Sequence, residues 1–208
     1  MLPDPSQLPF RLGNGPFKIK GVAYRGTKKQ YDSLVKGGAA AVAASFTYAE
    51  LSIFSDTDFF ASSWYDIFPM AYMDYRAAEI AGLPFEEFAH LAADLQAKSD
   101  MNGVYRLLLK FFSPASALKQ LAVLSTIYFN FGKSSVSLES KAAATVTTVG
   151  VPVALEQWFL RATAYYIGYC LQLTGAKNLR YEFLKSKPGE AFDGQDTVDV
   201  RWRVTWDA

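Results

Sequence analysis

The chain has 208 residues, of which 50% are hydrophobic and 15% aromatic, enough for one domain with a substantial core. Its 21 lysines and arginines balance 20 aspartates and glutamates, which argues against a nucleic-acid-binding surface. Cys170 is the single cysteine, so an intrachain disulfide is excluded. Because the sequence has neither a signal peptide nor an apolar run of roughly 18 residues, we expect a cytoplasmic protein without a membrane span.

The first 17 residues predict a flexible N-terminal arm. Four prolines and two glycines occur in this stretch, and they remove amide donors and leave the backbone free. Leu8, Phe10 and Leu12 are apolar residues that could pin the arm to the body. Residues 18–208 are expected to form one domain.

A short strand and two helices are predicted after the arm. Residues 18–24 alternate loosely, as in a strand. Thr27 is a suitable N-cap for a first helix, which the glycines at 37 and 38 would end. Residues 39–49 are small and apolar and predict a second helix.

The middle of the chain predicts four further helices, because its apolar residues recur at three-four spacing. Gly82 is expected to end the first of these helices. The third would carry Val104, Leu107, Leu108 and Phe111 on its inner face. The start signals of the four helices are Ser63, Pro84, Asp100 and the pair Ser113-Pro114.

After Gly132 the apolar period changes from nearly four to two. This alternation predicts one long strand that Gly150 and Pro152 close. Residues 153–174 then predict the longest helix, placed centrally. Two further strands, residues 179–185 and 198–206, are expected to pair antiparallel. The apolar residues of the long strand are Val136, Leu138, Ala142, Ala144 and Val146.

The order of these elements predicts an α+β fold. An N-terminal helical layer would pack on a small, mainly antiparallel sheet with a long central helix. The elements would follow one another as strand–helices–strand–helix–strand–strand.

Residues that commonly catalyse reactions are scarce. His90 is the single histidine, and no Gly-x-Ser-x-Gly elbow accompanies it. Residues 131–134 (Phe-Gly-Lys-Ser) resemble the end of a phosphate-binding loop, but the first glycine of that motif is replaced by Ile127. We therefore predict no catalytic residue and no enzyme activity.

Metal ligands are equally sparse, since a zinc site would have to rely on carboxylates. The candidate groups lack the glycine and terminal glutamate of a calcium loop, and capping and turn roles explain them. We predict no metal and no cofactor. The candidate groups are Asp56 with Asp58, and Asp193 with Asp196 and Asp199.

Aromatic residues crowd the predicted long helix and suggest a ligand pocket. Each buried tyrosine hydroxyl needs a hydrogen-bond partner, so a tyrosine cluster is a costly way to fill a core. A cavity lined by rings explains the cluster, and ordinary packing with hydroxyls reaching the surface remains the alternative. Cys170 is either a small buried hydrophobe or a site of acylation or adduct formation that faces a cavity. The predicted pocket residues are Trp158, Ala162, Tyr165, Tyr169 and Cys170.

Residues 18–206 resemble an uncharacterised bacterial protein family that is abundant in myxobacteria. The features that carry this resemblance are the opening at residues 19–22, the aromatic segment at 64–69, the long penultimate helix and the closing residues 200–202. The order of elements is also similar to that of haem-NO-binding sensor domains and, more distantly, of vinyl-reductase-like and vesicle-tethering-subunit folds.

The resemblance implies a scaffold that holds a small molecule or an acyl chain between helices and sheet. Haem-NO-binding domains hold iron through a histidine and the propionates through a Tyr-x-Ser-x-Arg motif. The corresponding stretch here, residues 118–138, contains neither histidine nor arginine, which argues against haem.

Two functions therefore stay open. The first is a non-enzymatic sensory or ligand-binding domain that takes an apolar small molecule. The alternative is a structural or protein–protein interaction module with a filled core, for which a homodimer is one arrangement.

Overall fold

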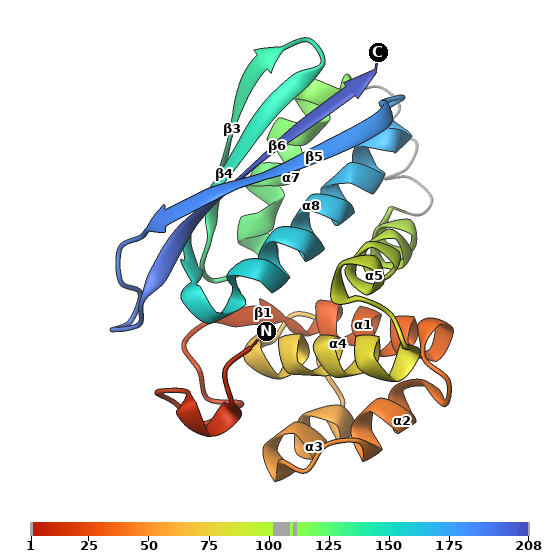
Figure 1. The fold of residues 1–208 in the computed structure, drawn as a ribbon, viewed down its shortest axis with the longest axis vertical. Helices are drawn as coiled ribbons and strands as arrows, with labels where there is room; N and C mark the ends of the chain where they lie inside the picture. The colour runs from red at the N-terminus through yellow and green to blue at the C-terminus, as the bar shows by residue number, and fades with distance from the viewer. Residues whose placement is uncertain (1, 102–108, 110–111, 208) are drawn as a thin grey trace.

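The computed structural model describes residues 2–101, 109 and 112–207, and they form two parts stacked along the long axis (Figure 1). The lower part in this view is helical and contains the N-terminus. The upper part is a four-stranded sheet with helices on one face. Helix α5 (Phe85–Asp100) joins the two parts and packs against α8 (Glu156–Leu173).

The N-terminal part has short helices around a two-stranded antiparallel sheet. Its interior is filled with aromatic rings: Tyr24 is fully buried, and its ring centroid lies 4.2 Å from that of Phe59. The elements are β1 (Lys18–Lys20), α1 (Gly21–Leu34), α2 (Gly38–Ala44), α3 (Ala49–Asp56), β2 (Trp64–Asp66) and α4 (Phe68–Ala81).

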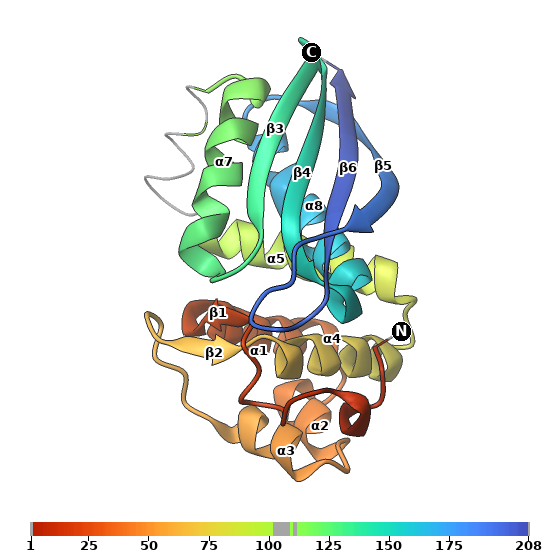
Figure 2. The same cartoon turned by 90° about the vertical axis from the view of Figure 1, so that its left-hand side faces the viewer.

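The C-terminal part is an antiparallel sheet in the order β3-β4-β6-β5. Its inner face is apolar, with Val146, Trp202 and Val204 buried. Helices α7 and α8 cover that face, and none of the described helices lies on the opposite face (Figure 2). The elements are α7 (Pro114–Tyr128), β3 (Lys133–Ser140), β4 (Ala143–Pro152), α8, β5 (Lys177–Pro188) and β6 (Thr197–Asp207).

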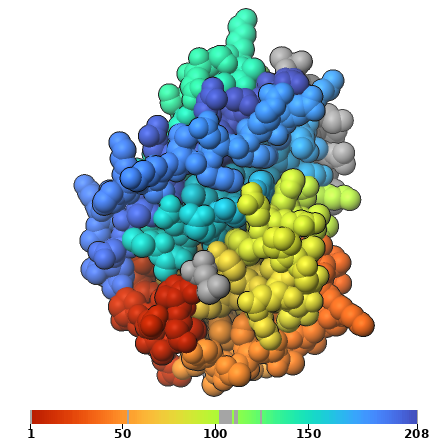
Figure 3. Space-filling view, in the orientation of Figure 1, coloured from red at the N-terminus to blue at the C-terminus, as the bar shows by residue number. Residues whose placement is uncertain are grey.

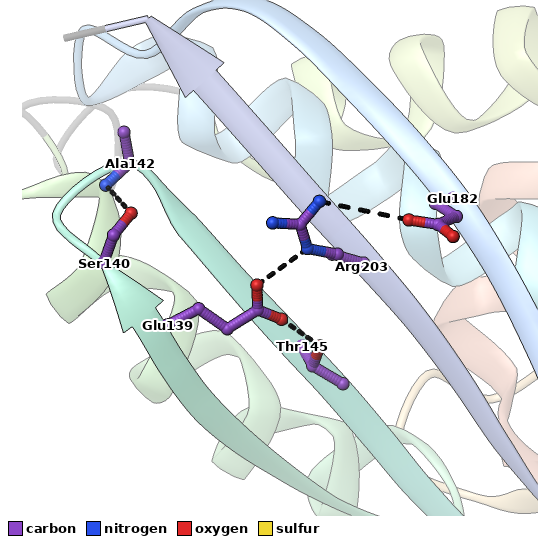
Figure 4. Close-up of polar contacts among 6 residues, drawn as sticks. All are labelled: Glu139, Ser140, Ala142, Thr145, Glu182 and Arg203. Atoms are coloured by element: carbon purple, nitrogen blue, oxygen red, sulfur yellow. Dashed lines mark hydrogen bonds and ion pairs between the residues drawn. The ribbon is translucent and has the colours of Figure 1, made fainter.

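The outer face of the sheet is polar. Arg203 on β6 lies between two neighbouring strands, and its Nε donates to Glu139 Oε2 on β3 at 2.7 Å (Figure 4). Glu182 on β5 lies 4.0 Å from the same guanidinium. Thr145 donates to the other carboxylate oxygen of Glu139 at 2.6 Å. These contacts tie β3, β4, β5 and β6 together on the solvent side.

The predicted α+β class is confirmed, as are several element boundaries. Gly82 ends α4 with a positive φ of 69°, and Ser113 caps α7 by accepting the backbone N–H of Ser116 at 3.2 Å. The predicted antiparallel pairing of the last two strands is also confirmed, because β5 pairs with β6. The single helix predicted at residues 153–174 is divided in the structure: a 3-10 turn at Val153–Leu155 comes first, and α8 follows it.

The predicted start of the first helix is wrong. Thr27 does not cap α1, which already begins at Gly21 directly after a three-residue strand. The first amides of α1, those of Gly21 and Val22, donate to backbone carbonyls of Ser63 and Ala61. A loop 40 residues away in the sequence therefore caps this helix, and no local side-chain signal marks it.

The helix predicted to start at Ser63 begins later. Trp64 lies on β2, and α4 starts at Phe68 because Asp66 accepts the N–H of Phe68 at 3.0 Å. The predicted second helix at 39–49 is shorter than expected: α2 ends at Ala44, and a separate α3 follows.

The predicted single long strand is a hairpin of β3 and β4. Val136 pairs with Val146 and Leu138 with Ala144, so both strands place even-numbered residues on the same face. The two-residue alternation therefore runs through the turn without a break, and the sequence looks like one strand.

Residues 2–17, predicted to be a flexible arm, pack against the body. The backbone N–H groups of Gly13 and Gly15 donate to Asp66 Oδ2 at 2.8 and 3.0 Å. Phe10 packs edge-on against Phe68, and Tyr72 donates to the carbonyl of Pro3. The arm therefore belongs to the N-terminal part in this structure, and the space-filling view shows its residues, in red, packed against the body (Figure 3).

One predicted helix cannot be compared with the structure. Its inner residues, Val104, Leu107, Leu108 and Phe111, lie outside the described residues. Asp100, its predicted cap, is the last residue of α5. In the described part of the chain, no helix has the length and apolarity needed to cross a membrane.

Candidate functional site

A cavity of about 460 Å³ lies between the two parts of the molecule. Helices α1, α4 and α5 supply one side, and α7, α8 and the inner face of the sheet supply the other. Large apolar side chains form much of the wall, among them Met70, Phe88, Trp158, Phe159 and Trp202.

Small side chains make room for the cavity. Six of its lining residues are alanines, and they come from four different helices. An alanine projects a single methyl group, so a wall of alanines leaves space that leucine or phenylalanine would fill. The six are Ala23 on α1, Ala89, Ala92 and Ala93 on α5, Ala122 on α7, and Ala162 on α8.

A chain of hydrogen bonds crosses one end of the cavity. Gln30 Nε2 on α1 donates to Gln96 Oε1 on α5 at 2.6 Å. Gln96 Nε2 donates to both oxygens of Asp100, at 2.8 and 2.9 Å. Tyr166 on α8 donates its hydroxyl to Asp100 Oδ2 at 3.2 Å. We call these four residues the Asp100 network. All four line the cavity, so the network presents polar groups to whatever occupies it.

Gly26 makes room for the Asp100 network. A Cβ atom at Gly26 would lie 1.9 Å from Gln96 Oε1. Any larger residue there would displace the Gln96 side chain from the position that joins Gln30 to Asp100. Burial raises the pKa of Asp100, against the lowering effect of the bonds from Gln96 and Tyr166.

A second carboxylate lies in the cavity wall. Asp74 on α4 accepts the hydroxyl of Tyr31 at 2.6 Å and the indole N–H of Trp158 at 2.8 Å. Burial raises the pKa of Asp74 to about 6, although both hydrogen bonds favour the ionised form. Asp74 therefore links α1 and α4 to the central helix α8.

The structure places two of the five predicted pocket residues, Trp158 and Ala162, in the cavity wall. Tyr165, Tyr169 and Cys170 are not among its lining residues. Tyr165 faces Ala89 and Ala93 of α5 from outside the cavity and donates to Glu86 at 2.9 Å.

Cys170 is fully buried beside Ala97 and Leu121, and Tyr169 packs against this cluster. Burial raises the pKa of the Cys170 thiol to about 12, so it carries little thiolate at neutral pH.

Sequence reasoning missed Tyr166, Gln30, Gln96, Asp100 and Asp74. The sequence could have identified Tyr166, because residues four apart lie on the same face of a helix. The cavity side of α8 carries Trp158, Ala162 and Tyr166 at this spacing. The four other residues lie on helices α1, α4 and α5, and the tertiary fold brings them to α8.

The cavity lacks several features of a haem or metal site. Among its described lining residues there is no histidine, arginine or lysine. His90 is 53% exposed, lies 4.0 Å from Asp94 and packs against Tyr165 outside the cavity. Within the described ranges, no three His, Cys, Asp or Glu side chains are grouped to hold a metal ion.

No protein-family model matches this chain, and no curated protein sequence matches it. Solved structures of H-NOX domains do match its fold. An oxygen-binding H-NOX domain related to soluble guanylate cyclases, solved as its oxygen complex, is 12% identical with a TM-score of 0.64. The match covers 91% of this chain and 96% of that chain.

Two further H-NOX structures give the same result. The Fe(II) unliganded H-NOX protein from K. algicida is 10% identical with a TM-score of 0.64, covering 91% of this chain and 97% of that one. A Cs H-NOX mutant carrying 4-cyano-L-phenylalanine at site 5 is 10% identical with a TM-score of 0.66 and the same coverage. These likenesses establish the fold and confirm that part of the predicted resemblance: the chain has an H-NOX-like α+β fold.

Proposed function

We propose that the chain is a non-enzymatic ligand-binding or sensory domain whose cavity holds an apolar small molecule without haem. The observation that carries this proposal is the 460 Å³ cavity with its wall of alanines and aromatic rings. Ligand pockets in proteins are typically of this size, largely apolar, with a few placed polar groups.

The cavity is partly open to solvent, so water fills it when no ligand is bound. The apolar wall favours a molecule that replaces water, because burying apolar surface is favourable.

Native mass spectrometry of the purified protein tests this function. We expect a mass excess that disappears on denaturation, and binding of the neutral fluorescent probe N-phenyl-1-naphthylamine after the retained molecule is removed. Ala92→Trp, which places a large ring in the cavity wall, should reduce probe binding. Protein that always has its bare mass and never binds the probe would contradict the proposal.

The absence of haem in this proposal rests on charge and ligand chemistry. Haem iron in proteins takes an axial ligand such as histidine, and its two propionates favour cationic partners. The described cavity wall offers Asp74 and Asp100, which would repel propionates, and His90 lies outside it.

We expect purified protein to be colourless and to show no Soret band after addition of hemin. A sharp, stoichiometric Soret band would contradict this expectation, and its loss in His90→Ala would identify the iron ligand.

Exposed apolar residues favour an interaction module as the second candidate. Val123 and Ile127, four residues apart on α7, are 64% and 58% exposed. Residues at this spacing share a helix face and could contact a partner or a second copy of the chain. The mass spectrum reports the oligomeric state together with any ligand, so one experiment compares both candidates.

A further inference from the structure

Asp100 determines which group donates and which accepts in each hydrogen bond of the Asp100 network. An ionised carboxylate only accepts hydrogen bonds, so Gln96 must turn its amide nitrogen toward Asp100. The carbonyl oxygen of Gln96 then faces Gln30, which must donate from its own amide nitrogen. The orientation of both glutamines therefore follows from Asp100.

This orientation leaves an acceptor free at the other end. Gln30 is 8% exposed and lines the cavity, and no described residue donates to its carbonyl oxygen. This carbonyl oxygen is accessible from the cavity, so it can accept a hydrogen bond from water or from a ligand.

The charged side chains in the described cavity wall are all negative. Asp74 and Asp100 are the charged groups among the described lining residues, and neither forms an ion pair with a described lysine, arginine or histidine. Their described hydrogen-bond donors are the neutral groups of Tyr31, Trp158, Gln96 and Tyr166.

The helix that carries Asp100 adds to this field. Asp100 is the last residue of the 16-residue helix α5. The C-terminal end of a helix carries a partial negative charge from its unpaired carbonyl groups, so it attracts cations and repels anions. The carboxylate of Asp100 and the C-terminal end of α5 therefore both favour a cation at this end of the cavity.

We propose that the cavity selects apolar amines: the hydrocarbon part lies against the alanine and aromatic wall, and the ammonium group donates to Asp100. This inference rests on the proposed ligand-binding function and names its ligand class. It makes molecules with a carboxylate or phosphate head poor ligands.

Three ligands with the same ten-carbon tail test the head-group preference. Decylamine, decanol and decanoate are used at pH 7 to displace N-phenyl-1-naphthylamine from the protein. We expect decylamine to bind about tenfold more tightly than decanol, as one charge-assisted hydrogen bond is worth about 1.5 kcal/mol or more. Decanoate should bind most weakly.

Asp100→Asn removes the charge and keeps the shape of the side chain. In this variant we expect decylamine to lose its advantage over decanol. Asp94→Asn is the matched control: it lies on the same helix, its side chain is 44% exposed, and it is not among the cavity-lining residues. Circular dichroism checks that both variants keep the fold, and Asp94→Asn should retain the wild-type preference.

The outcomes separate this inference from the proposed function. If decanol, decylamine and decanoate bind equally, or decanoate binds best, the amine preference is overturned and the ligand-binding cavity stands. If Asp100→Asn keeps the full preference for decylamine, Asp100 is not the recognition group and the inference fails. If neither the probe nor any ten-carbon compound binds the wild type, the proposed function itself fails.

Discussion

Helix α1 separates two interiors that are built in opposite ways. On one side, Tyr24 is stacked on Phe59, and Tyr65 meets Phe59 edge-on with ring centroids 4.8 Å apart. On the other side, Ala23 and Gln30 of the same helix face the cavity. Aromatic rings therefore close the first interior. In the second interior they form part of the wall, and the alanines beside them leave space.

The carboxylates of the two interiors differ in the same way. Asp66, in the filled part, accepts three backbone N–H groups, from Gly13, Gly15 and Phe68. Its role is to hold the N-terminal segment and the start of α4. Asp100, at the cavity, accepts from two neutral side chains and faces open space. The carboxylate of Asp66 is therefore enclosed by backbone amides, whereas that of Asp100 is held by side chains at the wall of the cavity.

The largest difference is expected when an aromatic ring is removed from the filled interior. Phe59→Ala should lower the free energy of unfolding by about 3–5 kcal/mol, because the neighbouring rings cannot close the space. Ile127→Ala, at the exposed rim of the cavity, should cost less than about 1 kcal/mol. Urea denaturation measures both. Equal losses would mean that the two regions are packed alike.

Enlarging an alanine of α8 should have different effects on stability, depending on which of the two interiors the alanine faces. Ala164 on α8 is fully buried in the core, and Ala162, two residues earlier, lines the cavity. Ala164→Leu should cost about 1–3 kcal/mol through overpacking. Ala162→Leu should leave stability nearly unchanged and weaken binding of N-phenyl-1-naphthylamine. A similar loss of stability in both variants would show that the space beside Ala162 closes in solution.

A smaller effect is expected from the pH dependence of Asp74. Its pKa rises from the ordinary value of 3.8 to about 6 on folding, so the folded state binds the proton more tightly than the unfolded state. The stability from this group is complete below pH 4 and is lost as the pH rises through 6. The loss is about 1–3 kcal/mol by pH 7, because one pKa unit corresponds to about 1.4 kcal/mol.

Asp74→Asn isolates this contribution, since the variant lacks the titrating group and keeps the others. Unfolding by urea at several pH values should show the wild type losing stability relative to Asp74→Asn between pH 4 and 7. A constant difference between the two proteins over that range would contradict the assignment to Asp74.

The sequence predicted elements whose signals are local. The backbone freedom of Gly82 and the hydroxyl of Ser113 mark the ends of helices, the alternation at residues 198–206 identifies a strand, and the structure agrees with all three. It could not reveal the start of α1, whose cap is a loop around residues 61–63. It also could not separate β3 from β4, since their alternation keeps the same phase across the turn.

The cavity wall was partly accessible to sequence reasoning. Trp158 and Ala162 follow from the apolar face of one helix, and Tyr165 was included because seven-residue spacing also shares a face. In the structure the next residue of α8 in the wall is Tyr166, and the predicted Tyr165, one position earlier, is not among the lining residues. Gln30 and Gln96 are 66 residues apart in sequence, and their contact depends on how α1 meets α5.

The position of β6 has a consequence for how the protein is made. This strand lies between β4 and β5, although it follows both in the chain. On the ribosome, the β3–β4 hairpin can form as soon as it emerges, but β5 has no neighbour until residues 197–207 appear. Until then the nascent chain exposes an unpaired strand edge and the apolar side of α8, both of which favour aggregation. The four-stranded sheet therefore cannot be complete until β6 has been synthesised.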